Sequence, residues 1–270
     1  MWVCPCVGSI MGDLKLGRLP RHFNPAVPHL SALRSQITLP KPPRQLDYAA
    51  SLAPDLGMMG NDQVGDCADA AYFHALQVWS KNATGIEHTV PDDTAVQLYC
   101  DQAGYVRGNP ATDQGSVLQL LLVYLMKTGA LMPDGTRKKI LGFVEVDTRN
   151  QDDLDLTTAE CGGVYAGFNC PTWFSDVEAP GSTWDFAAGA SPQTKDGHCI
   201  FTPGYYQNHS RKVISWGSDD YTMTEAFELQ FMDEGYGIIT QDFVDARNGK
   251  TPYGIPLDVW EQQMSAMKAA

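Results

Sequence analysis

The sequence is poor in basic residues, with 19 Lys and Arg against 32 Asp and Glu and a formal net charge of −13 at pH 7. Nucleic acids and anionic membrane surfaces attract proteins through clusters of Lys and Arg. The acidic residues are spread along the chain, which is typical of a solvated surface rather than an acidic tail. We therefore expect no nucleic acid and no membrane as a main partner.

Long apolar runs are also missing. The most apolar stretch, Leu118 to Met126, is far shorter than a membrane-spanning helix. The first residues lack a basic region followed by a long apolar core, so we expect no secretory signal. The sequence shows no internal repeat. These absences predict a soluble globular protein made in a reducing compartment.

The cysteines do not form a metal-binding or disulfide pattern. There are seven, an odd number, at irregular spacing, and no CxxC pair is matched by a second CxxC or by an HxxxH. Cys4-Pro-Cys6 is the closest pair, and metal binding, oxidation and no role at all remain open for it. We expect no structural metal and no cofactor.

One stretch, Asn61 to His74, reads as a loop that leads into a helix. Asp66 is a suitable N-cap, Asp69 completes an acidic capping box, and helical periodicity extends from Cys67 to Lys81. A thiol at a helix N-terminus is favoured as thiolate by the helix dipole, but the two carboxylates oppose this effect. Cys67 therefore needs a cationic partner, and without one it reads as a small buried hydrophobe.

A partner for Cys67 is found in the second half of the chain. His198 follows Gly197 and opens an apolar strand. The separation of Cys67 and His198 along the chain resembles that of papain-type cysteine–histidine pairs. A lone histidine at the start of a strand is more often structural, so the pairing with Cys67 is what favours catalysis.

Hydrophobic periodicity predicts the remaining elements. Besides 67–81, helices are expected after Pro91 and at 116–127, 152–160 and 224–232. Strands are expected at 140–146, 164–170, 199–206, 212–216 and 236–240, with a surface loop at 171–195. A helical first part followed by an antiparallel sheet is an α+β pattern.

Three segments are expected along the chain. Residues 1–45 are rich in proline, so we predict an extended N-terminal arm. Residues 46–250 form the domain, and residues 251–270 form a C-terminal tail or helix. We expect the apolar side chains of the arm to dock into grooves on the domain and, in part, on another chain. These side chains are Leu19, Phe23, Val27, Leu30 and Leu33.

Three short motifs, in this order, resemble the papain-like cysteine peptidases. They are Cys67 at a helix start, Gly197-His198 with Gly204-Tyr205, and Ser215-Trp216-Gly217, and they span about residues 46–245. The resemblance implies a papain-like fold with a helical lobe at about 46–135 and a sheet lobe at about 136–245. It implies that Cys67 attacks a carbonyl and that His198 transfers the proton.

The departures from the family pattern concern the supporting residues. Asn61 stands where the family has the glutamine that donates to the oxyanion, and Gln63 is an alternative donor. Ile214 stands where the family has the asparagine that orients the histidine. Side chains alternate along a strand, so we expect Ser215 to face away from the histidine. Ser215 would then be a poor substitute for the asparagine. Asn208, in a turn, is another candidate partner.

Trp216 remains available to shield the histidine from water, as the tryptophan of the family motif does. The whole chain also resembles uncharacterised proteins encoded by tailed phages and prophages, including the segment Leu16-Gly17-Arg18-Leu19-Pro20. This second resemblance implies a location in the cytoplasm of the bacterial host or in the virion. It also implies a place in a larger assembly.

Three functions therefore remain open. The first is a cysteine hydrolase, a peptidase or isopeptidase with a polypeptide substrate. The second is a papain-fold virion structural protein with a weak or inactive site, such as a capsid decoration, cement or adaptor protein. The third is a Cys–His peptidoglycan amidase or endopeptidase.

Overall fold

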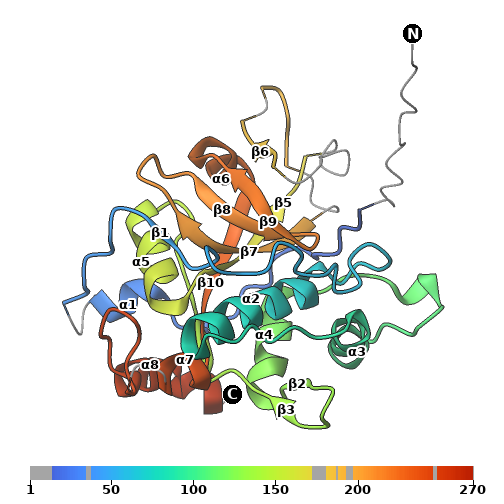
Figure 1. Cartoon of the computed structure of the whole chain (residues 1–270), viewed down its shortest axis with the longest axis horizontal. Coiled ribbons are helices and arrows are strands. Elements are labelled where there is room, and N and C mark those ends of the chain that lie inside the picture. The colour runs from blue at the N-terminus through green and yellow to red at the C-terminus, as the bar shows by residue number, and fades with distance from the viewer. Residues whose placement is uncertain are drawn as a thin grey trace.

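The computed structural model of the chain describes residues 14–34, 38–171, 181–186, 188–192, 197–245 and 248–269. Helices gather on one side of the molecule and a large sheet lies on the other (Figure 1). The main helices precede most of the strands in sequence, which confirms the predicted α+β class. Cys4 and Cys6 lie outside the described residues, as does much of the expected loop at 171–195.

The helices are α1 Leu30–Arg34, α2 Cys67–Thr84, α3 Asp92–Ala103, η1 Pro110–Thr112 (a 3-10 turn), α4 Leu118–Lys127, α5 Gln151–Cys161, α6 Glu225–Phe231, α7 Gln241–Asp245 and α8 Leu257–Ala269. The strands are β1 Leu46–Asp47, β2 Ala130–Leu131, β3 Arg137–Lys138, β4 Gly142–Glu145, β5 Val164–Asn169, β6 Thr183–Trp184, β7 Gly197–Tyr205, β8 Arg211–Ser215, β9 Ser218–Met223 and β10 Met232–Ile239.

Within the described residues the main sheet has eight strands. Seven lie in the order β4-β10-β5-β7-β8-β9-β6, and β1 pairs with β7 outside this path. Neighbours are antiparallel except for β6 and β9, which are parallel. Strand β7 is therefore central, since it pairs with β5, β8 and β1. No helix of the described part is long and apolar enough to cross a membrane.

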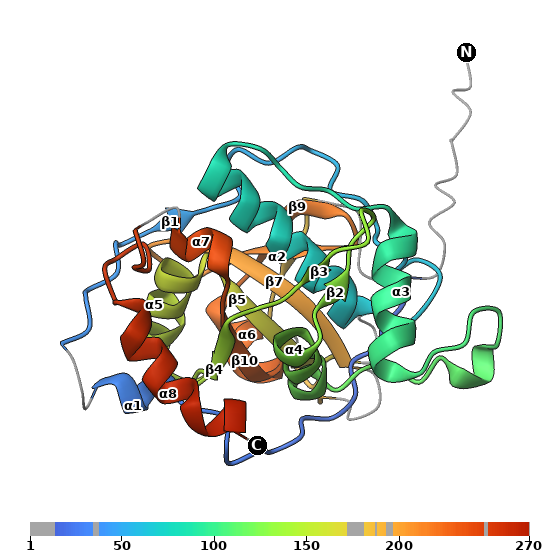
Figure 2. The same cartoon turned by 90° about the horizontal axis from the view of Figure 1, so that it is seen from below.

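Helix α2 packs against β7 and joins the two layers (Figure 2). Its residues Cys67 to Ser80 are all buried, because small alanines and large aromatics cover every side of the helix. The ring of Trp79 meets Phe201 of β7 edge to face at 5.8 Å, and the Tyr165 hydroxyl donates to the Ala68 carbonyl at 2.7 Å. These contacts fix the start of α2 against the sheet.

Two details of α2 differ from expectation. The helix begins at Cys67, as predicted, but ends at Thr84, where Gly85 adopts the left-handed conformation with φ of 78°. Asp66 occupies the N-cap position, yet its side chain makes no capping hydrogen bond. Its backbone ψ of 24° differs from the extended conformation typical of a capping residue.

Strand β9 was missed by the sequence prediction. Its residues Ser218 to Met223 are mostly polar and alternate only partly between buried and half-exposed. Trp216 and Gly217 both have positive φ, 45° and 75°, and form the tight turn between β8 and β9. Because tryptophan rarely adopts a positive φ, the sequence gives no indication of a turn at this position.

The described part of the N-terminal segment, residues 14–34, packs on the folded body. Residues Leu30 to Arg34 form helix α1, and Val27, Leu30 and Leu33 lie in the hydrophobic core with at most 8% exposure. Helix α1 lies beside α8 (Figure 2). The prolines precede and follow this short helix, and Leu30 and Leu33, three residues apart, point to the same side. Phe23, in contrast, is 69% exposed on this body, so its docking on another chain stays a prediction.

Truncating a core residue of this segment tests how strongly it belongs to the domain. We expect Leu33→Ala to lower the free energy of unfolding by about 2–5 kcal/mol, because it leaves a cavity in the core. Phe23→Ala is the matched control and should change it by less than about 0.5 kcal/mol. Urea unfolding of both variants measures the difference, and equal stability would return the segment to the status of a passive arm.

Candidate functional site

The site lies where α2 packs on β7. Cys67 is the first residue of α2, and the peptide N–H of Cys199 in β7 lies close enough to its thiol to oppose the rise in its pKa. Cys199 directly follows His198 in β7. Cys67 and His198 are each 1% exposed. A direct contact between the sulfur and a ring nitrogen of His198 stays a prediction.

The ring of His198 is held by two residues of the turn after β8. Its Nε2 lies 2.8 Å from the Ser215 hydroxyl oxygen. Its plane stacks on Trp216, with ring centroids 4.4 Å apart and 16° between the planes. The expected shielding by Trp216 therefore has a geometric basis, while the expectation that Ser215 faces away from the histidine is wrong.

Strand register explains why Ser215 and not Ile214 reaches the histidine. Ile214 is the cross-strand partner of Phe201, so these two side chains share a face. Phe201 is three residues from His198 on β7 and so points to the opposite face. Ser215, one residue beyond Ile214, returns to the face of His198. The serine hydroxyl takes the place that the resemblance gives to an asparagine amide.

The other predicted polar residues are Asn61, Gln63 and Asn208. The Asn61 amide donates to the Val64 carbonyl within its own loop, at 3.3 Å. Gln63 is exposed in the same loop. Asn208 is exposed in the β7–β8 turn and accepts from the Ser210 backbone and hydroxyl, so it is not the partner of His198. Oxyanion donation by Asn61 or Gln63 stays a prediction.

The N-terminal segment runs directly over the thiol. The N–H groups of Gly17 and Arg18 donate to the Gly197 carbonyl at 3.1 and 2.9 Å, and the Gly17 N–H also reaches the Cys67 sulfur. Gly197 forms one wall of the groove and Ser116 forms the other. The backbone N–H of Ser116 donates to the Gly17 carbonyl at 2.7 Å, and its carbonyl accepts from the Leu19 N–H at 2.8 Å. The segment is thus bound as an extended peptide between the two lobes.

Further contacts hold the start of this segment. The Lys15 N–H donates to the Asn61 carbonyl at 3.2 Å, and the Trp216 indole lies 3.4 Å from the Lys15 carbonyl. A residue that touches the histidine therefore also touches the covering segment. The sequence does not predict this pattern, and Leu16 to Pro20 contributes there only to the resemblance to phage and prophage proteins.

Glycines make the close approach of the segment possible. A Cβ atom on Gly17 would lie 1.9 Å from the Gly65 carbonyl oxygen, and one on Gly115 would lie 2.0 Å from the Gly17 carbonyl oxygen. A Cβ atom on Gly197 would lie 2.5 Å from the Arg18 carbonyl oxygen. No larger residue fits these positions while the segment stays in place. The groove therefore recognises a peptide backbone at short range.

Burial under this segment keeps the thiol and the imidazole neutral. The pKa of Cys67 is raised to about 12, mainly by desolvation and to a smaller extent by the nearby Asp66 and Asp69 carboxyls. Desolvation also lowers the pKa of His198 to about 3. Burial raises the pKa values of Asp66 and Asp69 well above their usual range. The covered site therefore favours neutral groups over a thiolate–imidazolium pair.

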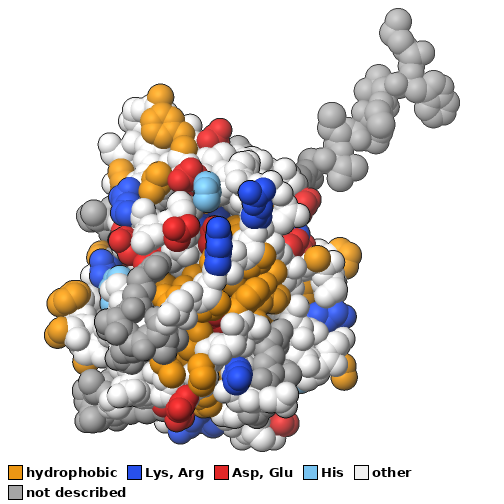
Figure 3. All heavy atoms as spheres, turned by 90° about the vertical axis from the view of Figure 1, so that its left-hand side faces the viewer, with side chains coloured by type: hydrophobic (Ala, Val, Ile, Leu, Met, Phe, Trp, Pro, Cys, Tyr) orange, Lys and Arg blue, Asp and Glu red, His pale blue; other side chains and the backbone are white. Residues whose placement is uncertain are grey.

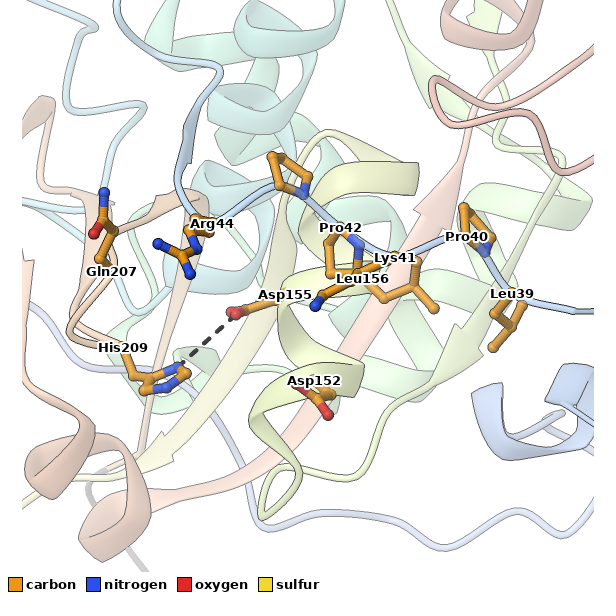
Figure 4. A pocket seen from close by; sticks show the side chains of 11 residues that line it. Leu39, Pro40, Lys41, Pro42, Arg44, Asp152, Asp155, Leu156, Gln207 and His209 are labelled. Atoms are coloured by element: carbon orange, nitrogen blue, oxygen red, sulfur yellow. Dashed lines mark ion pairs between the residues drawn. The ribbon is translucent and has the colours of Figure 1, made fainter.

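A separate pocket of about 570 Å³ shares no residue with this site (Figure 4). The proline-rich segment 39–44 forms one wall of the pocket, and an ion pair between His209 and Asp155 crosses the pocket at 3.9 Å.

Seen from the side of α1, apolar side chains gather in one area with charged side chains around it (Figure 3). Among the described residues, no group of three His, Cys, Asp or Glu is arranged to hold a metal ion.

Comparisons with known proteins identify the fold. No family model matches the chain, and no curated protein matches it. Xylellain, a cysteine protease from Xylella fastidiosa, is similar with a TM-score of 0.59 and 15% identity, over 85% of this chain and 97% of that one. Procathepsin L2 from the larval midgut of Tenebrio molitor has a TM-score of 0.59 and 13% identity, over 86% and 81%.

A plant enzyme is similar as well. The cysteine protease CMS1MS2 of Carica candamarcensis, solved in complex with E-64, has a TM-score of 0.51 and 14% identity, over 73% of this chain and 99% of that one. These likenesses show that the chain has the papain-like fold, as the three short motifs implied. At such low identity they show the fold alone.

Removing the Ser215 hydroxyl tests its bond to His198. We expect Ser215→Ala to lower the free energy of unfolding by about 1–3 kcal/mol, because a buried ring nitrogen loses this partner. Asn208→Ala, in the exposed turn, should change it by less than about 0.5 kcal/mol. Chemical denaturation of both variants provides the measurement. An equal effect of the two substitutions would contradict the assignment of Ser215 as the residue that positions the histidine.

Proposed function

We propose that this protein is a papain-like cysteine hydrolase of polypeptides, with Cys67 as nucleophile and His198 as acid and base. In the covered state it is latent. The observation that carries the proposal is the backbone binding of residues 15–19 between the lobes, directly over the Cys67 thiol. A groove that binds one extended peptide at a buried thiol and next to a histidine has the parts that peptide hydrolysis requires.

The chemistry follows acyl transfer. With the segment displaced, the Cys67 proton passes to His198, and the thiolate attacks the carbonyl carbon of a bound peptide. The Cys67 N–H at the start of α2 stabilises the oxyanion, with Asn61 or Gln63 as the proposed second donor. His198 gives its proton to the leaving amine as the C–N bond breaks. A water molecule, deprotonated by His198, then releases the acid and restores the thiol.

The covering segment is not expected to be cleaved by Cys67. The N–H of Gly17, a hydrogen-bond donor, lies near the thiol and opposes the rise in its pKa. The raised pKa of Cys67 keeps almost all of the thiol protonated at pH 7. Both features explain how an active hydrolase can carry this segment intact.

A second candidate is a structural role for a papain fold without activity. The neutral thiol and imidazole and the tightly fitted glycine contacts of the segment favour a permanently closed site. The proposed phage origin fits both candidates and rests on the Asn61–Cys67 element, the Gly197-His198 strand and the Trp216-Gly217 turn. For this candidate we propose a place in the virion or the cytoplasm of the bacterial host, in contact with virion proteins. Peptidoglycan cleavage by the same pair is the further alternative.

Displacing the segment should expose a reactive thiol. Gly17→Ala puts a Cβ atom 1.9 Å from the Gly65 carbonyl oxygen, so the segment cannot stay in the groove. We expect Cys67 in this variant to react with iodoacetamide at pH 7 at least about 100 times faster than in the unchanged chain. Mass spectrometry of the alkylated cysteine peptides measures the rate.

The pH profile separates the two states. In the unchanged chain, where the Cys67 pKa is about 12, the rate should rise about tenfold per pH unit between pH 6 and 8. In the Gly17→Ala chain an ion pair makes the rate nearly constant over this range, and His198→Ala should restore the steep dependence. His22→Ala, an exposed change in the same segment, is the control. Slow labelling in every variant would support the structural role instead.

A further inference from the structure

The covering segment inserts one charged side chain deep into the protein. The guanidinium of Arg18 is fully buried and bonds to Glu234 through Nε at 2.6 Å and through Nη2 at 2.5 Å. It also donates hydrogen bonds to Asp233 Oδ2 at 2.9 Å and to the Asn169 side-chain oxygen at 3.1 Å, and forms an ion pair with Asp233 Oδ1 at 2.8 Å. Several donors of the planar guanidinium are thus matched by acceptors, which is how proteins recognise arginine rather than a generic cation.

The pocket is shaped for the stem of this side chain as well. A Cβ atom on Gly167 of β5 would lie 2.8 Å from the Arg18 Nε, and one on Gly197 of β7 would lie 3.1 Å from the Arg18 Cδ. Asn169 stands on β5, and Asp233 and Glu234 stand on the neighbouring β10. Three strands therefore leave a channel that any larger residue at the two glycines would close.

The acidic end of the channel requires a cation. The Glu234 side chain is fully buried, and its second oxygen accepts from the Tyr236 hydroxyl at 2.6 Å. Burial raises the pKa of Glu234, and the charge of Arg18 opposes this rise. A buried carboxylate that loses its cationic partner is costly. When Arg18 leaves, the pocket favours another guanidinium in its place.

The position of the pocket relative to the thiol gives it a role. Arg18 follows Gly17, whose N–H reaches the Cys67 sulfur, and its backbone pairs with Ser116 on one wall and Gly197 on the other. Arg18 is therefore the residue at the centre of the groove. An extended peptide bound between the same walls places one side chain at this channel, next to its reacting bond.

We propose that the pocket formed by Asn169, Asp233 and Glu234 binds an arginine side chain of the substrate, and that Arg18 occupies it in the latent state. That the bound arginine belongs to a substrate rests on the proposed function. That the pocket binds arginine does not. Glu234 is the specificity-determining residue, because it is the buried carboxylate at the end of the channel. The protein then selects polypeptides with arginine beside the bond that is cleaved.

Binding can be tested without catalysis. The full chain carrying Cys67→Ala and Arg18→Ala retains the pocket but lacks both its occupant and the nucleophile. We expect acetyl-Ala-Ala-Arg-Ala-Ala-amide to bind at least about tenfold more tightly than the same peptide with citrulline, the neutral isostere of arginine. Calorimetric titration measures both dissociation constants. Adding Glu234→Gln should remove the preference.

Two further measurements keep the outcomes distinct. If Arg18→Ala does not fold, Cys67→Ala with Gly17→Ala displaces the segment and leaves the pocket intact for the same titration. Equal binding of the two peptides, or no binding of either to a folded variant, would overturn the inference. With Cys67 retained, the arginine peptide should be hydrolysed at least about tenfold faster than the citrulline peptide. Preferential binding without hydrolysis of any peptide would uphold the arginine pocket and reject the proposed activity.

Discussion

The buried ion pair between Arg18 and Glu234 is the interaction on which the proposed latent state depends. It anchors the N-terminal segment between the lobes, and the segment in turn excludes water from Cys67 and His198. Exclusion of water raises the pKa of the thiol and lowers the pKa of the imidazole. Breaking one partner of such a buried pair typically costs about 3–5 kcal/mol. In the proposed latent state, this pair therefore holds the segment over the site.

The parts of the site that differ from the papain pattern are replaced locally. The Ser215 hydroxyl meets the Nε2 of His198, where the resemblance implied an asparagine, and Trp216 covers the ring. A residue that orients the histidine is the most dispensable member of a catalytic triad, so a serine in this place is compatible with catalysis. The papain-like fold alone does not establish activity. The peptide-binding groove and its acidic pocket are the features that favour it.

The sequence predicts features that depend on neighbouring residues. It does not predict features that depend on the pairing of distant segments. The start of α2 at Cys67 followed from a loop and an apolar periodicity within one stretch of chain. The partner of His198 was misjudged, because the face that Ser215 presents depends on the pairing of Ile214 with Phe201. The proline content of residues 1–45 suggested an arm, yet Leu30 and Leu33 complete the core. The pocket around Arg18 joins residues from both ends of the chain, which no local pattern reveals.

Hydrolysis of a peptide by the opened chain tests the central claim most directly. The account predicts that the Gly17→Ala chain cleaves an arginine-containing fluorogenic peptide, and that the same chain with Cys67→Ala does not. The unchanged chain should be nearly inactive until its N-terminal segment is displaced. Absence of cleavage by a folded Gly17→Ala chain, or equal cleavage by the chain without the Cys67 thiol, would contradict the account.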